Sequence, residues 1–147
     1  MKIALGSDHA GYNLKEEIAE QLKSRGCLIK DCGVFSRESS DYPDTAETVS
    51  GAVQDGEVNF GILICGTGIG MSIAANKRKG IRAALCAESY SARCARQHNN
   101  ANILALGSRV TGVGLALEII DVFLATSFEG GRHQGRVDKV TALENTR

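Results

Sequence analysis

Residues 60–71 read FGILICGTGIGM, and this stretch decides the fold. Its first half, Phe60 to Cys65, is apolar on successive residues, which is typical of a parallel strand buried on both faces. Its second half carries three glycines between Gly66 and Gly70 and leads into a helical pattern. A buried strand that turns sharply into a helix is the start of a βαβ unit.

The same alternation of short apolar segments and helical patterns extends in both directions along the chain. Four more strands are predicted, at residues 3–5, 27–32, 81–86 and 103–106. Helical spacing relates two sets of apolar residues: Leu14, Ile18 and Leu22, and Val113, Leu117, Ile120 and Leu124. Pro43, the only proline, suits the first turn of another helix. We therefore predict one α/β domain over residues 1–147, a Rossmann-like three-layer sandwich with a five-stranded parallel sheet and a C-terminal helical tail.

The composition excludes several classes of function. Lys plus Arg and Asp plus Glu are both 17, so no overall positive field draws the chain toward nucleic acid or an anionic membrane. The apolar runs are too short to span a bilayer, and Met1 leads directly into a strand, so we expect a cytoplasmic protein. The five cysteines show neither CxxC nor Cys/His spacing, which argues against a disulfide framework or a metal site.

Cys65 and the glycines after it are the sharpest candidate for chemistry. Glycines let a ligand approach the backbone, and free N–H groups at a helix start favour an anion or a thiolate. Cys65 could then transfer a proton near neutral pH. The alternative is that the glycines only turn the chain and Cys65 is a small buried hydrophobic residue. A cysteine-phosphatase loop does not fit, because Met71 and Ser72 stand where an arginine is needed.

Asp8 and His9 follow the first strand and so share the sheet edge of Cys65. The carboxylate could orient hydroxyl groups while the imidazole meets an anion or moves a proton. For Asp8 the alternative is a helix N-cap. For Tyr42 the alternative is simple packing.

The remaining candidates lie in the second half of the chain. His98 and Asn99 close a helix that begins near Ser89, where both residue types also serve ordinary structural roles. Arg132 and Arg136 are four residues apart and would present one anion-binding face if that segment is helical.

Several separated motifs resemble the family that contains ribose-5-phosphate isomerase type B and the galactose-6-phosphate isomerase subunits. The motifs are Gly6-Ser7-Asp8-His9-Ala10-Gly11, Asp41-Tyr42-Pro43, Ile64-Cys65-Gly66-Thr67-Gly68, Ala74-Ala75-Asn76-Lys77, Arg96-Gln97-His98-Asn99, Gly107-Ser108-Arg109 and Gly131-Arg132-His133. One branch of this family has a glutamate further along the glycine loop in place of the cysteine. Ser72 and Ile73 stand there, so the chain resembles the cysteine branch.

The resemblance implies a role for each candidate. Cys65 would move hydrogen between C1 and C2 of the sugar, and His98 would help to open the ring. Asp8 and Tyr42 would lie along the sugar. The phosphate would bind to four basic residues: His9, Arg109, Arg132 and Arg136. The enediolate would meet N–H groups of the loop that holds Gly66, Gly68, Ile69 and Gly70, with Thr67 relaying a proton and Asn99 beside the substrate.

These roles imply an aldose–ketose isomerase of ribose 5-phosphate that needs no metal or other cofactor. Two alternatives stay open: an isomerase of allose or galactose 6-phosphate, and a non-catalytic sugar-phosphate sensor. Chain direction places His98 at the sheet edge opposite to Cys65, because the helix before it returns antiparallel to the strands. We therefore predict a homodimer with shared active sites, with a dimer of dimers as a further option.

Overall fold

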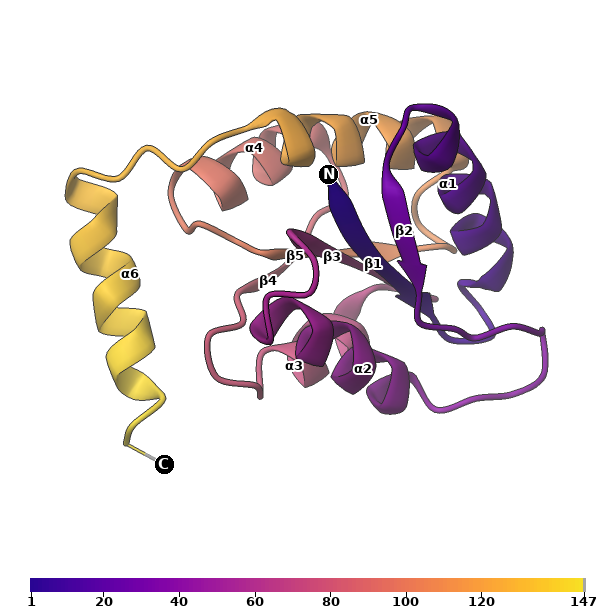
Figure 1. The fold of residues 1–147 in the computed structure, drawn as a ribbon, viewed down its shortest axis with the longest axis horizontal. Helices are drawn as coiled ribbons and strands as arrows, with labels where there is room; N and C mark the ends of the chain where they lie inside the picture. Colours follow the sequence, from indigo (N-terminus) through magenta and orange to yellow (C-terminus); the bar gives the residue numbers. More distant parts are fainter. Residues whose placement is uncertain (147) are drawn as a thin grey trace.

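The computed structural model describes residues 1–146, and its centre is a five-stranded sheet in which every neighbouring pair is parallel (Figure 1). The strands lie in the order β2-β1-β3-β5-β4. Their bounds are β1 Lys2–Ser7, β2 Leu28–Asp31, β3 Phe60–Cys65, β4 Ala83–Leu85 and β5 Ile103–Gly107. All five predicted strands are confirmed. The predicted bounds of β2 and β4 were too long, because the flanking residues Cys27, Cys32, Ile81, Arg82 and Cys86 lie in the connecting loops rather than in the strands.

Helices cover both faces of the sheet, which confirms the three-layer prediction (Figure 1). One face carries α1 (Tyr12–Ser24), α4 (Ser89–Gln97) and α5 (Val113–Ala125). The other carries α2 (Tyr42–Gln54) and α3 (Ile69–Ala75). Pro43 lies in the first turn of α2, as predicted.

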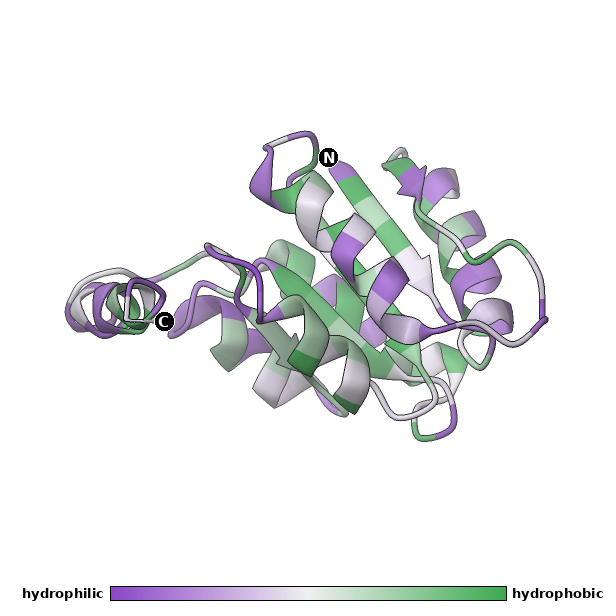
Figure 2. Ribbon diagram, turned by 90° about the horizontal axis from the view of Figure 1, so that it is seen from below, coloured by the Kyte–Doolittle hydropathy of each residue, from purple (hydrophilic) through white to green (hydrophobic). Residues whose placement is uncertain are grey.

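Alternation along each strand divides the interior into two cores. Ile62 and Ile64 of β3 face α1 and α5, while Leu63 and Cys65 face α2 and α3. Every one of these four residues is buried, and apolar residues fill the middle of the sheet in Figure 2. A strand covered on both sides must be apolar at every position, which accounts for the sequence pattern of β3.

The two amphipathic patterns were predicted with unequal success. Leu14, Ile18 and Leu22 all lie on the buried face of α1. The predicted face of α5 was partly wrong: Ile120 is buried and Val113 is exposed, while Leu117 and Leu124 are half-buried. The buried residues of α5 are Ala116, Ile119, Ile120 and Phe123. Because α5 is apolar around most of its circumference, spacing alone does not select the inner face.

The predicted C-terminal helix is α6 (Arg132–Leu143), and it stands beside the body rather than on it (Figures 1 and 2). His133 and Val137 are its buried residues, whereas Val140 and Leu143 are 51% and 62% exposed. Within residues 1–146, no helix combines the length and the apolar character needed to cross a membrane.

Candidate functional site

The carboxyl ends of β1, β3 and β5 meet at one edge of the sheet and build the first group of candidate residues. The register pairs Ser7 with Ile64 and Cys65 with Gly107. The Asp8 N–H donates to the Ile64 carbonyl at 3.1 Å. β2, the next strand along the chain, lies on one side of β1, and β3 lies on the other side. Asp8 and Cys65, at the ends of β1 and β3, therefore flank the point where the strand order reverses. Ligands of open α/β sheets bind in the crevice at such a point.

Cys65 is 5% exposed, and its sulfur accepts a hydrogen bond from the Gly68 N–H at 3.1 Å. Gly68 reaches this position with a φ of 79°, a left-handed conformation that favours glycine. A backbone N–H is therefore aimed at the sulfur, where it can donate to negative charge. The glycines therefore turn the chain and also supply a donor to the buried cysteine, so the two interpretations of the sequence are not exclusive.

Asp8 is buried, and its Oδ1 accepts a hydrogen bond from the Gly11 N–H at 3.1 Å. The N-cap interpretation of Asp8 is wrong, because Gly11 is the N-cap residue of α1 and Asp8 instead closes the turn before it. A side chain at Gly11 would meet the Ile64 carbonyl oxygen at 2.6 Å. This close approach holds the first turn of α1 against the end of β3.

Three more predicted residues surround the glycine loop. The Tyr42 ring packs on Gly70, where an added Cβ would lie 2.8 Å from the ring, yet Tyr42 remains 40% exposed. The Arg109 side chain lies against Gly66, and the Arg109 N–H donates to the Gly66 carbonyl at 3.0 Å. Thr67 is exposed, and its hydroxyl oxygen accepts from the N–H of Ile69 at 3.3 Å. The loop therefore presents hydroxyl, phenol and guanidinium groups near Cys65.

His9 is held by the loop before α2. Its N–H donates to the Ser40 hydroxyl at 3.0 Å, and its Nδ1 lies 3.2 Å from the Ser40 N–H. With Nδ1 facing Ser40, Nε2 is the nitrogen available to a ligand.

The second group of candidates lies at the opposite, amino edge of the sheet. His98 is the C-cap of α4, with Asn99 directly after it. Arg96 fixes this turn by donating to the carbonyl of Ala101 at 2.5 Å and to Oδ1 of Asn100 at 3.0 Å. Four steps along β5 at ~3.3 Å each separate the two edges by about 13 Å. One chain therefore does not bring His98 to Cys65, in agreement with the prediction from chain direction.

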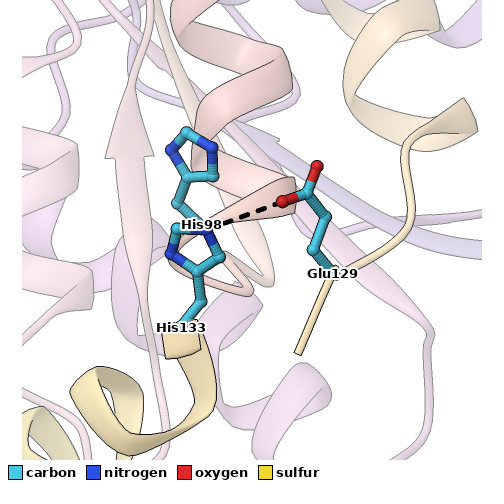
Figure 3. Close-up of side chains that lie close together, drawn as sticks. All are labelled: His98, Glu129 and His133. Atoms are coloured by element: carbon cyan, nitrogen blue, oxygen red, sulfur yellow. Dashed lines mark ion pairs between the residues drawn. The ribbon is translucent and has the colours of Figure 1, made fainter. Parts of the chain in front are cut away.

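Residues of α6 and the segment before it complete the second group (Figure 3). The His133 ring stacks on His98 with centroids 4.4 Å apart and an interplanar angle of 14°. Nε2 of His133 lies 3.5 Å from a carboxylate oxygen of Glu129. Burial lowers the pKa of His133, and the neighbouring His98, Arg132 and Arg136 act in the same direction while Glu129 opposes them.

A cavity of about 760 Å³ separates α6 from the body and is open to these residues. His98, Asn99, His133 and Arg136 line it. The adjoining wall is basic, with Lys77, Arg78, Lys79 and Arg82. Arg132 and Arg136 are both helical and exposed, as the spacing predicted. The arrangement can attract an anion to the amino edge of the sheet.

Glu129 and His133 are the residues that sequence reasoning missed. Their i, i+4 spacing and the Gly131-Arg132-His133 motif were the available signals, but the stacking on His98 exists only in the fold. No metal ligand was predicted from the sequence. In the part of the chain that the structure describes, His98, Glu129 and His133 are the one group of His, Cys, Asp and Glu side chains whose donor atoms could share an ion.

Comparison with known proteins gives consistent results over nearly the full chain. The Ribose/Galactose Isomerase family matches residues 3–140. Ribose-5-phosphate isomerase B of Escherichia coli (strain K12) is 56% identical over 146 residues, covering 99% of this chain and 98% of that protein. D-erythrulose-4-phosphate isomerase of Pectobacterium atrosepticum is 46% identical over 146 residues, covering 99% of this chain and 96% of that protein.

Solved structures agree with these sequence relationships. The structure of Clostridium thermocellum ribose-5-phosphate isomerase B is 57% identical and superposes with a TM-score of 0.98, covering 99% of both chains. That of Trypanosoma cruzi type B ribose 5-phosphate isomerase is 45% identical with a TM-score of 0.96, covering 100% of both chains.

Proposed function

The chain belongs to the ribose/galactose isomerase family, and we propose that it interconverts ribose 5-phosphate and ribulose 5-phosphate. The observation that carries this proposal is the buried Cys65 sulfur at the carboxyl edge of the sheet, with the Gly68 N–H donating to it at 3.1 Å. Aldose–ketose isomerisation needs a base that can take a proton from one carbon and return it to the next, and a cysteine sulfur with a backbone donor aimed at it suits that task.

The chemistry at this edge proceeds through an enediolate. The Cys65 thiolate removes the C2 proton of the open-chain sugar, and the electron pair moves to the C1 oxygen. N–H groups of the glycine loop stabilise the negative oxygen that forms. The exposed Thr67 hydroxyl relays a proton between the oxygens, and Cys65 returns its proton to C1 to give the ketose. Asp8 and Tyr42 orient the sugar hydroxyls.

The ring-opening group and part of the phosphate site are supplied by a second copy of the chain. His98 and Asn99 lie at the amino edge, about 13 Å from the level of Cys65 by the rise of a strand. A two-fold dimer is the simplest closed assembly that joins the two edges. The exposed Val140 and Leu143 on α6 give such an assembly apolar surface to bury.

The phosphate is bound by basic groups from both edges, His9 and Arg109 near the glycine loop and Arg132 and Arg136 on α6. Guanidinium groups bind phosphate through paired donors, so they hold the charged end of the open chain while the reacting carbons lie at Cys65. Charged sugar phosphates do not cross membranes unaided, so the enzyme acts in the cytoplasm with its substrate.

The relatives do not fix the number of carbon atoms in the sugar substrate. The more similar relative is named for ribose 5-phosphate, whereas one at 46% identity is named for the four-carbon D-erythrulose 4-phosphate. The family's own description includes galactose. The higher identity favours the five-carbon sugar, with four-carbon and six-carbon phosphates as alternatives. A pure sensor is disfavoured, since binding alone does not need a thiol with an aimed donor.

A parallel assay tests the substrate. Purified protein is incubated with ribose 5-phosphate, allose 6-phosphate, galactose 6-phosphate, D-erythrulose 4-phosphate and free ribose, and the change in ketose is followed. We expect kcat/KM to be highest for ribose 5-phosphate and very low for free ribose, because the phosphate contacts are lost. Equal turnover of ribose and ribose 5-phosphate would reject the phosphate site, and no turnover of any sugar would favour the sensor.

A further inference from the structure

Three side chains from separate parts of the chain converge beside the cavity under α6. His98 ends α4, Glu129 lies in the segment that leads to α6, and His133 is in the first turn of α6 (Figure 3). The backbone fixes this convergence, because the Glu129 N–H donates to the Gln97 carbonyl at 3.1 Å. Glu129 is thereby held next to the end of α4, and the tight turn at Gly130 and Gly131 brings His133 back over His98.

The donor atoms are close to one another. One nitrogen from each imidazole and one carboxylate oxygen lie within 4.8 Å of each other. Among residues 1–146, the two imidazole rings make one polar side-chain contact, between Nε2 of His133 and a carboxylate oxygen of Glu129 at 3.5 Å. Around a tetrahedral ion with bonds of about 2.0–2.2 Å, neighbouring donors lie roughly 3.3 Å apart. The greatest donor–donor distance therefore exceeds the distance around one ion by about 1.5 Å at most.

We propose that His98, Glu129 and His133 form a binding site for a divalent first-row transition-metal ion, with zinc the best fit. Two imidazoles and one carboxylate are a set that zinc takes in proteins, and they leave a fourth position open. Magnesium and calcium prefer oxygen ligands and do not suit two nitrogens.

Metal binding needs one ring to turn. A ligated imidazole has the ion in its own plane, and two stacked rings cannot both meet that condition. His98 is the ring to rotate, because it is only half-buried and lines the cavity, whereas His133 is buried. Glu129 is exposed and adjusts freely. The positive charges of Arg132, Arg136 and the basic wall of the cavity oppose a cation, so we expect micromolar rather than tighter affinity.

The ion would act as an inhibitor. This consequence rests on the proposed function, in which His98 opens the sugar ring. A metal that takes the lone pair of His98 removes it from proton transfer. The enzyme would work without metal and lose activity when zinc occupies this site.

Binding is tested apart from activity. Chelator-treated Cys65→Ala protein, which lacks the active-site thiol, is titrated with zinc chloride in a calorimeter, and with Co²⁺ while the visible spectrum reports tetrahedral coordination. We expect one ion per chain. Glu129→Gln should weaken the affinity at least about tenfold, and His133→Asn should abolish the signal. The matched control is Glu144→Gln, which lines the same cavity outside the cluster and should bind as the parent does.

Inhibition supplies the second arm. Measured relative to its own activity without zinc, Glu129→Gln should need at least about ten times more zinc for half inhibition than the wild type, with chelator restoring each enzyme to its own starting activity. Absence of zinc binding, or equal affinity in the parent and in both ligand variants, would overturn the site. Zinc binding that these variants weaken but that leaves turnover intact would uphold the site and count against the role of His98.

Discussion

The ends of β3 and β4 each carry a buried cysteine at the same edge of the sheet, but the two sulfur atoms have opposite hydrogen-bond surroundings. At the end of β3, the Cys65 sulfur accepts the Gly68 N–H at 3.1 Å. After β4, Cys86 packs in the apolar core with α4 and α5, and its sulfur has the Ala84 carbonyl at 3.9 Å. Burial raises the pKa of the Cys86 thiol to about 11, and the charge of Glu88 adds to the shift.

The difference lies in the loop after each strand. Gly66 to Gly70 let the backbone fold back over the sulfur with a donor aimed at it, whereas a carbonyl near sulfur can only accept. A buried thiol without a donor stays protonated and inert, and one with a donor can exist as a thiolate. We therefore attribute the proposed reactivity of Cys65 to its loop, rather than to its burial or its position on the sheet.

The largest expected contrast is in turnover. Cys65→Ala should lower kcat for ribose 5-phosphate by 10²–10⁴-fold while substrate still binds, because general-base catalysis is typically worth that much. Cys86→Ala removes the same kind of thiol from the end of β4 and should keep near-normal kcat. Steady-state kinetics with calorimetric binding measures both. An alanine variant at Cys65 that retained more than about a tenth of the activity would reassign the base.

Thiol labelling sharpens the same contrast. Iodoacetamide should modify Cys65 first, with ribose 5-phosphate protecting it. At pH 8 a thiol with a pKa of about 11 is ionised about 100-fold less than an ordinary one with a pKa near 9, so Cys86 should be the slowest to react. Peptide mass spectrometry over a time course gives the rates. Faster labelling of Cys86 than of Cys65 would refute the assignment.

The donor itself is tested at Gly68. An added Cβ there would lie 2.9 Å from the backbone of Leu106, so the local backbone must shift, and we expect this shift to displace the Gly68 N–H from the sulfur. We expect kcat to fall at least about tenfold and labelling of Cys65 to slow. Gly56→Ala is the control, because Gly56 has a similar positive φ of 71° and nothing within 4 Å of the new Cβ. Equal losses in both variants would attribute the effect to backbone strain alone.

The smallest effect concerns stability at alkaline pH. The unfolded chain loses the Cys86 proton near pH 9, whereas the folded chain keeps it until about pH 11. The free energy of unfolding should therefore fall as pH rises through this window, by about 1–2 kcal/mol from this residue. Urea unfolding at pH 8 and pH 10.5 measures the change. Cys86→Ala should show a shallower pH dependence, and an unchanged dependence would contradict the assignment.

The sheet was predictable because strands that are buried on both faces are apolar at nearly every position of the sequence. Phe60 to Cys65 is apolar throughout, and the register places it between β1 and β5. The inner face of α5 was not predictable, since a helix that is apolar almost all round records no direction. The turn role of Asp8 was likewise missed, because an aspartate three residues before the N-cap of a helix and one at the N-cap look alike in sequence.

The positions of the candidate site residues within one chain were largely predictable. The carboxyl-edge residues came from strand ends, and the separation of His98 from Cys65 came from chain direction. The cluster of Glu129 and His133 with His98 was not foreseen, because it depends on a turn at two glycines with positive φ and on a helix that stands beside the body. The spacing of residues along the sequence indicates neither the turn nor the position of the helix.

The central claim is that each active site joins Cys65 of one chain to His98 of another, and subunit exchange tests it most directly. Cys65→Ala and His98→Ala, each nearly inactive alone, are mixed under conditions that native mass spectrometry shows to permit exchange. Half of the dimers would then be mixed, each with one intact site, so activity should return to about a quarter of the wild-type value. Confirmed exchange with no return of activity would contradict the shared site.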